Sequence, residues 1–84
     1  MAKPKPKPKP RLQYAVEQRL RMIDFLVAHY GTVNRSALED YYGISTPQAS
    51  LDLKRYMEMA PHNIRYDGSQ KTYTCKPTFQ RIWS

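Results

Sequence analysis

The sequence is short of cysteine and of long apolar runs, and each shortage argues against a class of protein. Cys75 is the single cysteine among 84 residues, so we expect no disulfide-linked secreted scaffold. Apolar stretches extend over only a few residues, so we expect neither a membrane-spanning helix nor a secretory signal. A chain this short holds one domain at most. We therefore expect a cytoplasmic protein.

Residues suited to catalysis are also sparse. His29, His62 and Cys75 are too few and too scattered for a structural zinc site, which usually needs four ligands. The sequence contains no phosphate-binding loop and no nucleophile motif. We therefore expect no enzymatic activity, no metal, no cofactor and no small-molecule ligand. Cys75 is expected to be a small buried apolar residue.

Positive charge is plentiful and is concentrated at the N-terminus. The net charge is +7, and a basic arm supplies five of the 14 basic residues: Lys3, Lys5, Lys7, Lys9 and Arg11. The rest of the chain carries nine basic and seven acidic residues, a net +2. The Lys–Pro repeat cannot be helical, because proline fixes φ and has no N–H to donate. Residues 1–11 are therefore expected to be a disordered or extended arm. Such an arm contacts phosphates or anionic lipid, or only improves solubility.

Apolar spacings of four and three predict a long first helix over residues 11–30, capped by Gly31. Its inward stripe is expected to be Leu12, Val16, Leu20, Ile23, Val27 and Tyr30. A short second helix is expected over residues 35–42, because Asn34 is a good N-cap and Gly43 can end a helix. The residues of this helix expected to point inward are Leu38, Tyr41 and Tyr42.

The third helix has the clearest start signal. Ser45 is placed to cap its N-terminus, Gln48 completes a capping box, and Pro47 falls in the first turn, where its missing N–H costs nothing. Pro61 ends the helix. The inward stripe is expected to comprise Ala49, Leu53, Tyr56 and Ala60.

After Pro61 the pattern changes from a helical to an alternating period. Short runs at residues 64–66 and 71–75 flank an Asp-Gly turn at residues 67–70, which predicts a β-hairpin. Beyond it, three large apolar residues either cap the core or form a contact patch: Phe79, Ile82 and Trp83. The order of elements predicts a mainly α fold with a small β-hairpin (α+β), namely a winged helix-turn-helix of three helices and a two-stranded wing. We expect it to cover residues 12–79, with a C-terminal tail over residues 80–84.

The tight turn between the second and third helices suggests what the domain does. Gly43 turns the chain and Ile44 serves as an apolar plug, as a helix-turn-helix requires. A third helix held in this way can place its outward face in the major groove of double-stranded DNA. The residues expected at the DNA are Ser45, Thr46, Pro47, Gln48, Ser50, Leu51, Lys54 and Arg55 of this helix, Arg35 and Ser36 of the second helix, and Gln70 and Lys71 of the wing.

These residues suit different contacts. The base-reading candidates are Thr46, Gln48 and Ser50, of which glutamine can bond adenine through two hydrogen bonds. Leu51 suits a thymine methyl group. Lys54 and Arg55 suit phosphates, and Arg35 and Ser36 can hold a phosphate at the N-terminus of the second helix.

Plainer interpretations stand beside these. Lys54 and Arg55 near a helix C-terminus can serve only the helix dipole, and Ser45 and Gln48 can serve only as caps. Asp52 lies among the contact residues and is expected to be an internal hydrogen-bond acceptor. The acidic residues expected off the contact surface are Glu39, Asp40 and Glu58.

Several short motifs also carry a family resemblance. The most specific are Asn34-Arg35, Ile44-Ser45, residues 48–53 (QASLDL), and Tyr66-Asp67 followed by Lys71 and Tyr73. Over about residues 19–79 the sequence resembles the N-terminal winged helix-turn-helix domain of WYL-domain transcription regulators, of the BrxR and CapW type and more distantly DeoR-like. The resemblance implies a dimeric repressor that binds a pseudo-palindromic operator in phage defence, with its recognition helix at residues 45–60 and its wing at 64–75. It also implies a bacterial or phage-encoded protein associated with the nucleoid. The WYL sensor domain of those regulators has no counterpart here, so we expect a stand-alone relative or part of a longer chain.

A contact between two copies is expected on the first helix. Four residues recur at spacings of four, three and four away from the core stripe, and two tail residues extend this face: Tyr14, Gln18, Arg21, Phe25, Ile82 and Trp83. Exposed aromatic residues in a group suggest a partner, whereas scattered ones need no explanation. The alternative function is a protein-interaction module or inhibitor that binds a host protein through Phe25, Tyr41, Tyr42 and Trp83. A third is RNA binding dominated by the arm.

Overall fold

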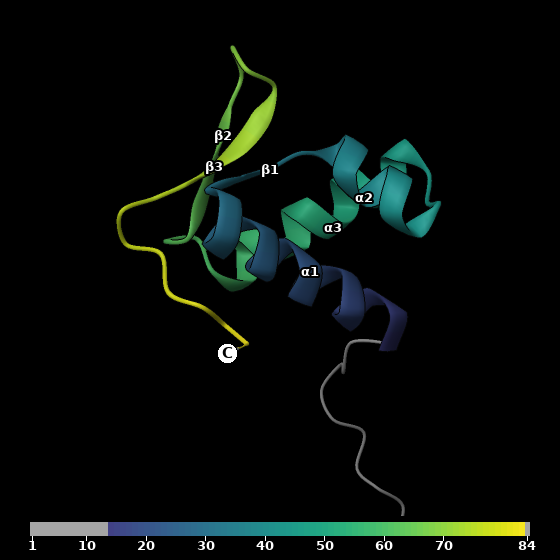
Figure 1. Ribbon diagram of the computed structural model, residues 1–84, viewed down its shortest axis with the longest axis horizontal. Helices are drawn as coiled ribbons and strands as arrows, with labels where there is room; N and C mark the ends of the chain where they lie inside the picture. Colours follow the sequence, from purple (N-terminus) through teal and green to yellow (C-terminus); the bar gives the residue numbers. More distant parts are fainter. Residues whose placement is uncertain (1–13, 84) are drawn as a thin grey trace, which may run out of the picture.

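The computed structural model describes residues 14–83 and contains three helices and three short strands. In chain order these are α1 (Tyr14–Tyr30), β1 (Thr32–Val33), α2 (Arg35–Tyr42), α3 (Thr46–Met59), β2 (Ile64–Asp67) and β3 (Thr72–Cys75). In Figure 1 the β2–β3 hairpin projects from one end of the helical layer. The predicted mainly α fold with a hairpin wing is confirmed. The predicted arm, the helix start at Arg11 and the inward Leu12 lie outside the described residues.

Local capping explains where α2 begins and ends. The Asn34 side chain accepts a hydrogen bond from the Ala37 N–H at 3.0 Å, which satisfies one of the free donors of the first turn. At the other end Gly43 adopts φ 67° and its N–H bonds the Glu39 carbonyl at 2.7 Å. A left-handed φ is strained for most residues but not for glycine, so Gly43 closes α2 and starts the tight turn into α3.

The start of α3 is confirmed, but the predicted capping box is wrong in its second half. The Ser45 hydroxyl accepts from the Gln48 N–H at 3.2 Å. The Gln48 side chain does not return to Ser45. Its amide nitrogen instead donates to Asp52 Oδ1 at 3.0 Å. The physical reason is that Asp52 is a buried carboxylate that needs donors, and a charged acceptor makes the stronger hydrogen bond.

The wing belongs to a three-stranded antiparallel sheet with the order β1-β3-β2. The predicted wing had two strands, and β1 adds a third by pairing with β3 opposite Thr74 and Tyr73. In the hairpin turn Lys71, and not Gly68, has a positive φ, of 55°. The Asp67 carboxylate accepts from the N–H groups of Ser69 and Gln70, an Asx turn that organises the loop before β3 begins at Thr72.

The core lies where α1, α3 and the sheet meet. Its buried apolar side chains are Leu20, Ile23, Val27, Val33, Leu38, Ala49, Leu53, Tyr56, Ala60 and Ile64. Two predicted inward residues are wrong, since Tyr30 is 68% exposed and Tyr41 is 69% exposed. Tyr30 is the last residue of α1, where the chain turns toward β1. On α2 the neighbouring Tyr42 takes the half-buried position and donates to the Gln18 carbonyl at 3.2 Å.

A buried carboxylate connects α1, α3 and the end of the chain. Asp24 is fully buried and accepts hydrogen bonds from the Tyr56 hydroxyl, from Arg81 Nε at 2.7 Å and from the N–H groups of Ile82 and Trp83 at 3.1 Å. Burial raises the pKa of Asp24, but these hydrogen bonds outweigh it and the net pKa is lowered.

The last residues of the chain are consequently bound to the domain. Phe79 and Trp83 are partly buried against the core, as the core-capping interpretation expected, whereas Ile82 remains exposed. Asn63 reinforces this arrangement by bonding the Tyr56 hydroxyl and both the carbonyl and the N–H of Gln80. Residues 80–83 are therefore held by directional hydrogen bonds to Asp24 of α1 and to Asn63, both of which also bond Tyr56 of α3.

Candidate nucleic-acid interface

α3 presents one face to the core and the other to solvent. Its inward residues are Ala49, Asp52, Leu53 and Tyr56, so the predicted apolar stripe is confirmed. Its exposed residues are Thr46, Pro47, Leu51, Lys54, Arg55, Glu58 and Met59, preceded by the exposed cap Ser45. Leu51 is 50% exposed at the middle of this face. An apolar side chain in that position is available for a contact outside the domain.

Gln48 and Ser50 lie at the two edges of the outward face and are both half-buried. The Gln48 edge is next to α1, because Gln48 bonds Asp52, and Asp52 bonds Arg19 of α1. The Ser50 edge is next to α2, because Arg35 Nη1 donates to the Ser50 hydroxyl at 3.4 Å. Asp52 is thus an internal hydrogen-bond acceptor, as expected from the sequence.

The N-termini of α2 and α3 each carry positive potential. Neither helix has an acidic residue in its first turn, so the dipoles of both N-termini are uncompensated by carboxylates there. Arg35 and Ser36 are exposed at the start of α2. The contact between Arg35 and Ser50 joins the start of α2 to the second turn of α3, and the free N–H groups at the α2 start are able to hold an anion.

The wing carries a pair of aromatic residues on which the positive charge of Arg35 acts. The Tyr66 and Tyr73 rings pack with centroids 4.8 Å apart on one face of the β2–β3 hairpin. Burial and the neighbouring Tyr66 raise the pKa of Tyr73, and the positive charge of Arg35 partly offsets this rise. Tyr66 is exposed and was not predicted as a site residue. The signal that could have found it is the alternating pattern of the two strands, which pairs Tyr66 with Tyr73. At the wing tip Gln70 and Lys71 are both exposed.

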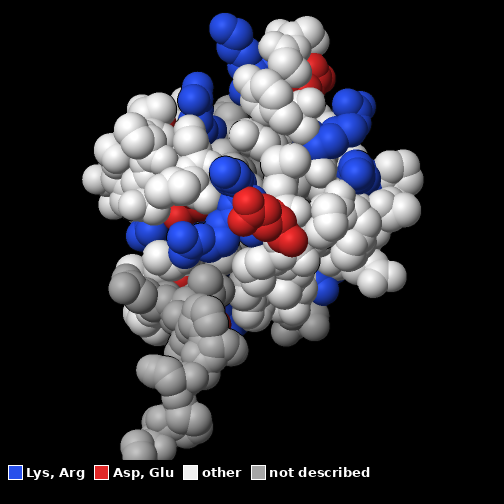
Figure 2. Space-filling model, turned by 180° about the vertical axis from the view of Figure 1, so that it is seen from behind, with Lys and Arg blue, Asp and Glu red and all other residues white. Residues whose placement is uncertain are grey.

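Charge on the described surface is mixed rather than uniformly positive. In Figure 2, which shows the molecule from behind, basic side chains spread from the wing downward around a central acidic group. This distribution agrees with the near-balance of charge outside the arm. The five arm cations lie outside the described residues.

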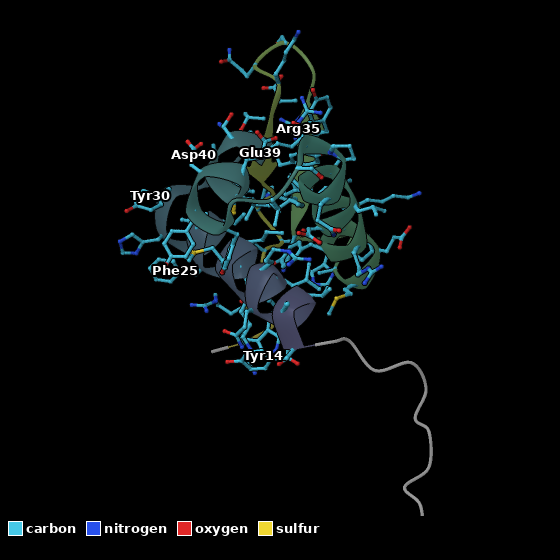
Figure 3. All side chains as sticks on the ribbon, turned by 90° about the vertical axis from the view of Figure 1, so that its right-hand side faces the viewer. Tyr14, Phe25, Tyr30, Arg35, Glu39 and Asp40 are labelled. Carbon is cyan, nitrogen blue, oxygen red and sulfur yellow. The ribbon has the colours of Figure 1, made fainter. Side chains whose placement is uncertain are left out.

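A shallow groove of about 360 Å³ lies between α1 and α2. Its lining residues are Gln18, Arg21, Met22, Phe25, Tyr41 and Tyr42. The structure therefore brings together three of the predicted dimer residues, and Phe25 is 44% exposed there. Figure 3 shows Phe25 on one side of the molecule, the α3 ribbon on the other, and Tyr14 at the far end of α1. Ile82 and Trp83 do not line the groove, but the Arg21 guanidinium lies 5.4 Å from the Trp83 ring centroid.

Other candidate chemistry is absent from residues 14–83. No group of three or more His, Cys, Asp or Glu side chains is placed to hold a metal ion within this range. None of the described helices combines the length and the apolar character needed to cross a bilayer. Cys75 is half-buried against the core rather than fully buried.

The arrangement of three helices, tight turn and wing is matched by a known family. The family model for the winged helix-turn-helix domain of the BrxR transcriptional regulator matches residues 15–84. The chain belongs to this family. The BrxR-type resemblance noted in the sequence is thereby confirmed, over a slightly longer range than the motifs alone indicated.

Named relatives of this BrxR-type domain agree with the match. The chain is 44% identical over 71 residues to the DNA-binding transcriptional repressor CapW of Escherichia coli (strain KTE188), which covers 84% of this chain. It is 38% identical over 71 residues to the CapW repressor of Pseudomonas aeruginosa and 38% identical over 72 residues to that of Stenotrophomonas maltophilia. In each case the match spans only 24% of the relative.

Proposed function

We propose that this BrxR-type domain binds double-stranded DNA in a sequence-specific manner and acts as a transcriptional repressor. The observation that carries the proposal is the outward face of α3, where exposed residues stand opposite a fully buried stripe. Relatives at 38–44% identity are named DNA-binding transcriptional repressors, which supports the same function for a domain that matches 24% of their length.

In this proposal α3 enters the major groove with its N-terminal half. Thr46 and the edge residues Gln48 and Ser50 read base edges, and Leu51 contacts a thymine methyl group. The remaining residues of the helix position it on the phosphates: Ser45, Pro47, Lys54 and Arg55. Because the opposite face of α3 is buried, a change on the outward face alters DNA contacts without opening the core.

Phosphate contacts from α2 and the wing fix the orientation of α3. Arg35 and Ser36 meet one phosphate with the free N–H groups of the α2 N-terminus. Gln70 and Lys71 reach the neighbouring backbone or the minor groove from the wing tip, and Tyr66 extends this contact along the hairpin. The arm cations add a further electrostatic contribution that does not depend on sequence.

The proposed active form is a homodimer on a pseudo-palindromic operator, with recognition helices about 34 Å apart. The groove between α1 and α2 and the neighbouring aromatic residues provide its contact surface. Phe25 and Tyr41 supply exposed aromatic area there, which is typical of interface anchors. The same groove favours a second candidate function, the capture of another protein in place of a second copy.

A mobility-shift experiment on the promoter region upstream of the protein's own gene tests the proposal. Wild type is compared with Lys54→Ala, and with Lys76→Ala as a matched control. Lys76 carries the same charge but bonds the Pro61 carbonyl at 2.9 Å, just beyond the C-terminal end of α3 and outside its proposed DNA-contacting residues. A discrete complex that resists nonspecific competitor, weakened by Lys54→Ala and unchanged by Lys76→Ala, supports the proposal. If binding is diffuse and equally salt-sensitive in all three proteins, α3 does not read DNA.

A protein partner gives a different pattern. Binding that is lost in Phe25→Ala or Tyr41→Ala and retained in Lys54→Ala indicates that the groove, rather than α3, is the functional surface. A footprint on DNA separates the two candidates further, because only a DNA-binding dimer protects two half-sites about one helical turn apart.

A further inference from the structure

Gln48 is held at the edge of α3 by a carboxylate that is itself anchored in the domain. Asp52 is 1% exposed. Arg19 of α1 donates to it through Nε at 2.5 Å and through Nη2 at 3.4 Å. Asp52 Oδ1 also accepts from Gln48 Nε2 at 3.0 Å. The chain of contacts Arg19–Asp52–Gln48 therefore runs from the first helix to the DNA-facing edge of the third.

The chemistry of Asp52 decides which end of the Gln48 amide points inward. A carboxylate paired with a guanidinium accepts hydrogen bonds and donates none, and Asp52 already accepts from Arg19. The amide of Gln48 must therefore present its nitrogen to Asp52 and direct its oxygen elsewhere. Among residues 14–83, Gln48 Oε1 accepts no hydrogen bond, and Gln48 is only half-buried. The oxygen is thus left available to a group outside the described domain.

We propose that Asp52 is a specificity-determining residue that positions Gln48 so that it reads a base carrying an amino group. This inference rests on the proposed function of α3. In the major groove the exposed amino groups are adenine N6 and cytosine N4, whereas guanine O6 and thymine O4 are acceptors. An outward Oε1 accepts from the amino bases and is repelled by the keto bases. The second N–H of the amide can also donate to adenine N7, so adenine is favoured.

Without Asp52 the same glutamine loses its direction. A free amide can rotate by half a turn and offer either its oxygen or its nitrogen, so it meets amino and keto bases alike. Asp52 never touches the DNA in this scheme. Its effect on sequence preference is transmitted entirely through Gln48.

The test is a selection from a pool of DNA duplexes with a randomised central segment, using the full chain. Wild type is compared with Gln48→Met and with the double variant Arg19→Met/Asp52→Leu. The double variant removes both charges of the buried pair at once, a replacement that is often neutral for stability. Asp52→Asn is a second variant of unchanged size, whose amide can meet either end of Gln48. Thermal melting shows whether each variant is folded.

Wild type is expected to prefer adenine or cytosine at one base pair of the half-site by about tenfold or more. Gln48→Met loses that preference, and the Asp52 variants relax it toward equal acceptance while the rest of the motif stays unchanged. In a Gln48→Met background, removal of Asp52 has no additional effect.

Two outcomes overturn the inference alone. In one, the Asp52 variants keep the wild-type preference. In the other, Gln48→Met leaves every position of the motif intact. If wild type selects no motif at all, the proposed function fails, and the inference fails with it. The two kinds of failure are therefore distinguishable from the wild-type result.

Discussion

Removal of the Asp24 carboxylate is expected to destabilise the whole domain. In Asp24→Ala the Tyr56 hydroxyl and the N–H groups of Ile82 and Trp83 lose their common acceptor. A buried donor left unsatisfied costs about 1–3 kcal/mol. The tail donors regain part of this from water, so we expect a loss of about 3–5 kcal/mol, the range typical of breaking a buried charged interaction. That is a large fraction of the roughly 5 kcal/mol available to a small domain.

Urea unfolding measures this effect with two probes. Circular dichroism follows the helices, and the fluorescence of Trp83, the single tryptophan, follows the docked tail. Asp24→Asn keeps one acceptor oxygen and is expected to lose less, about 2–3 kcal/mol. Glu17→Gln is the matched control, because Glu17 also lies on α1 but pairs with Arg21 at the surface. That change is expected to cost less than about 1 kcal/mol.

The pH dependence follows from the same group. The pKa of Asp24 is lowered in the folded state, so the folded protein binds this proton more weakly than the unfolded chain. The stability contributed by Asp24 is therefore present above the unfolded pKa of about 3.9, and it is lost as the pH falls through the folded pKa. The role of this network is contradicted if the free energy of unfolding of Asp24→Ala at neutral pH lies within about 1 kcal/mol of the wild-type value.

Further predictions separate the surfaces of the domain. Leu51→Ala should leave the free energy of unfolding within about 0.5 kcal/mol of wild type and weaken DNA binding, whereas Leu53→Ala, two residues along on the buried face, should cost about 2–5 kcal/mol in a denaturation curve. If the two variants lose equal stability, the assigned faces of α3 are wrong. Deletion of residues 3–10 should flatten the plot of log affinity against log salt by about 0.9 for each phosphate that the arm neutralises, and an unchanged slope argues against a role for the arm in binding. Phe25→Asp should shift the sedimentation of the protein from dimer to monomer, and a purely monomeric wild type excludes the proposed contact.

Features governed by neighbouring residues were predictable from the sequence. Asn34, Gly43 and Ser45 cap helices through contacts that span a few residues, so the limits of α2 and the start of α3 follow from the chain itself. The inward stripe of α3 follows from its helical period. The outward site residues are then the complement of that stripe, which is why most of them were expected.

Features governed by distant residues were not predictable in this way. Asp24 resembles an ordinary polar residue on α1, and its partners Ile82 and Trp83 lie 58 and 59 positions away. Tyr30 fits the apolar period of α1, which predicted that it points inward. The period does not show that the elements packed against α1 end before Tyr30, which is therefore exposed. The Gln48 side chain could have bonded Ser45 in a local cap, but it bonds the buried Asp52 instead. Asp52 is held in place by Arg19 of another helix, which the sequence near Gln48 does not reveal.

The two polar contacts between α1 and α3 have a mechanical consequence for how the protein can change. Asp52 and Tyr56 are one helical turn apart on α3, and each is joined to a different point of α1, Arg19 and Asp24 respectively. Apolar packing alone tolerates some sliding and rotation of a helix. Two directional hydrogen bonds instead fix the rotation of α3 about its axis and its position along α1. Substitutions of the outward residues therefore leave the position and rotation of α3 unchanged. Under the proposed function, such a domain can acquire a new target sequence by a few surface substitutions while its folded framework stays the same.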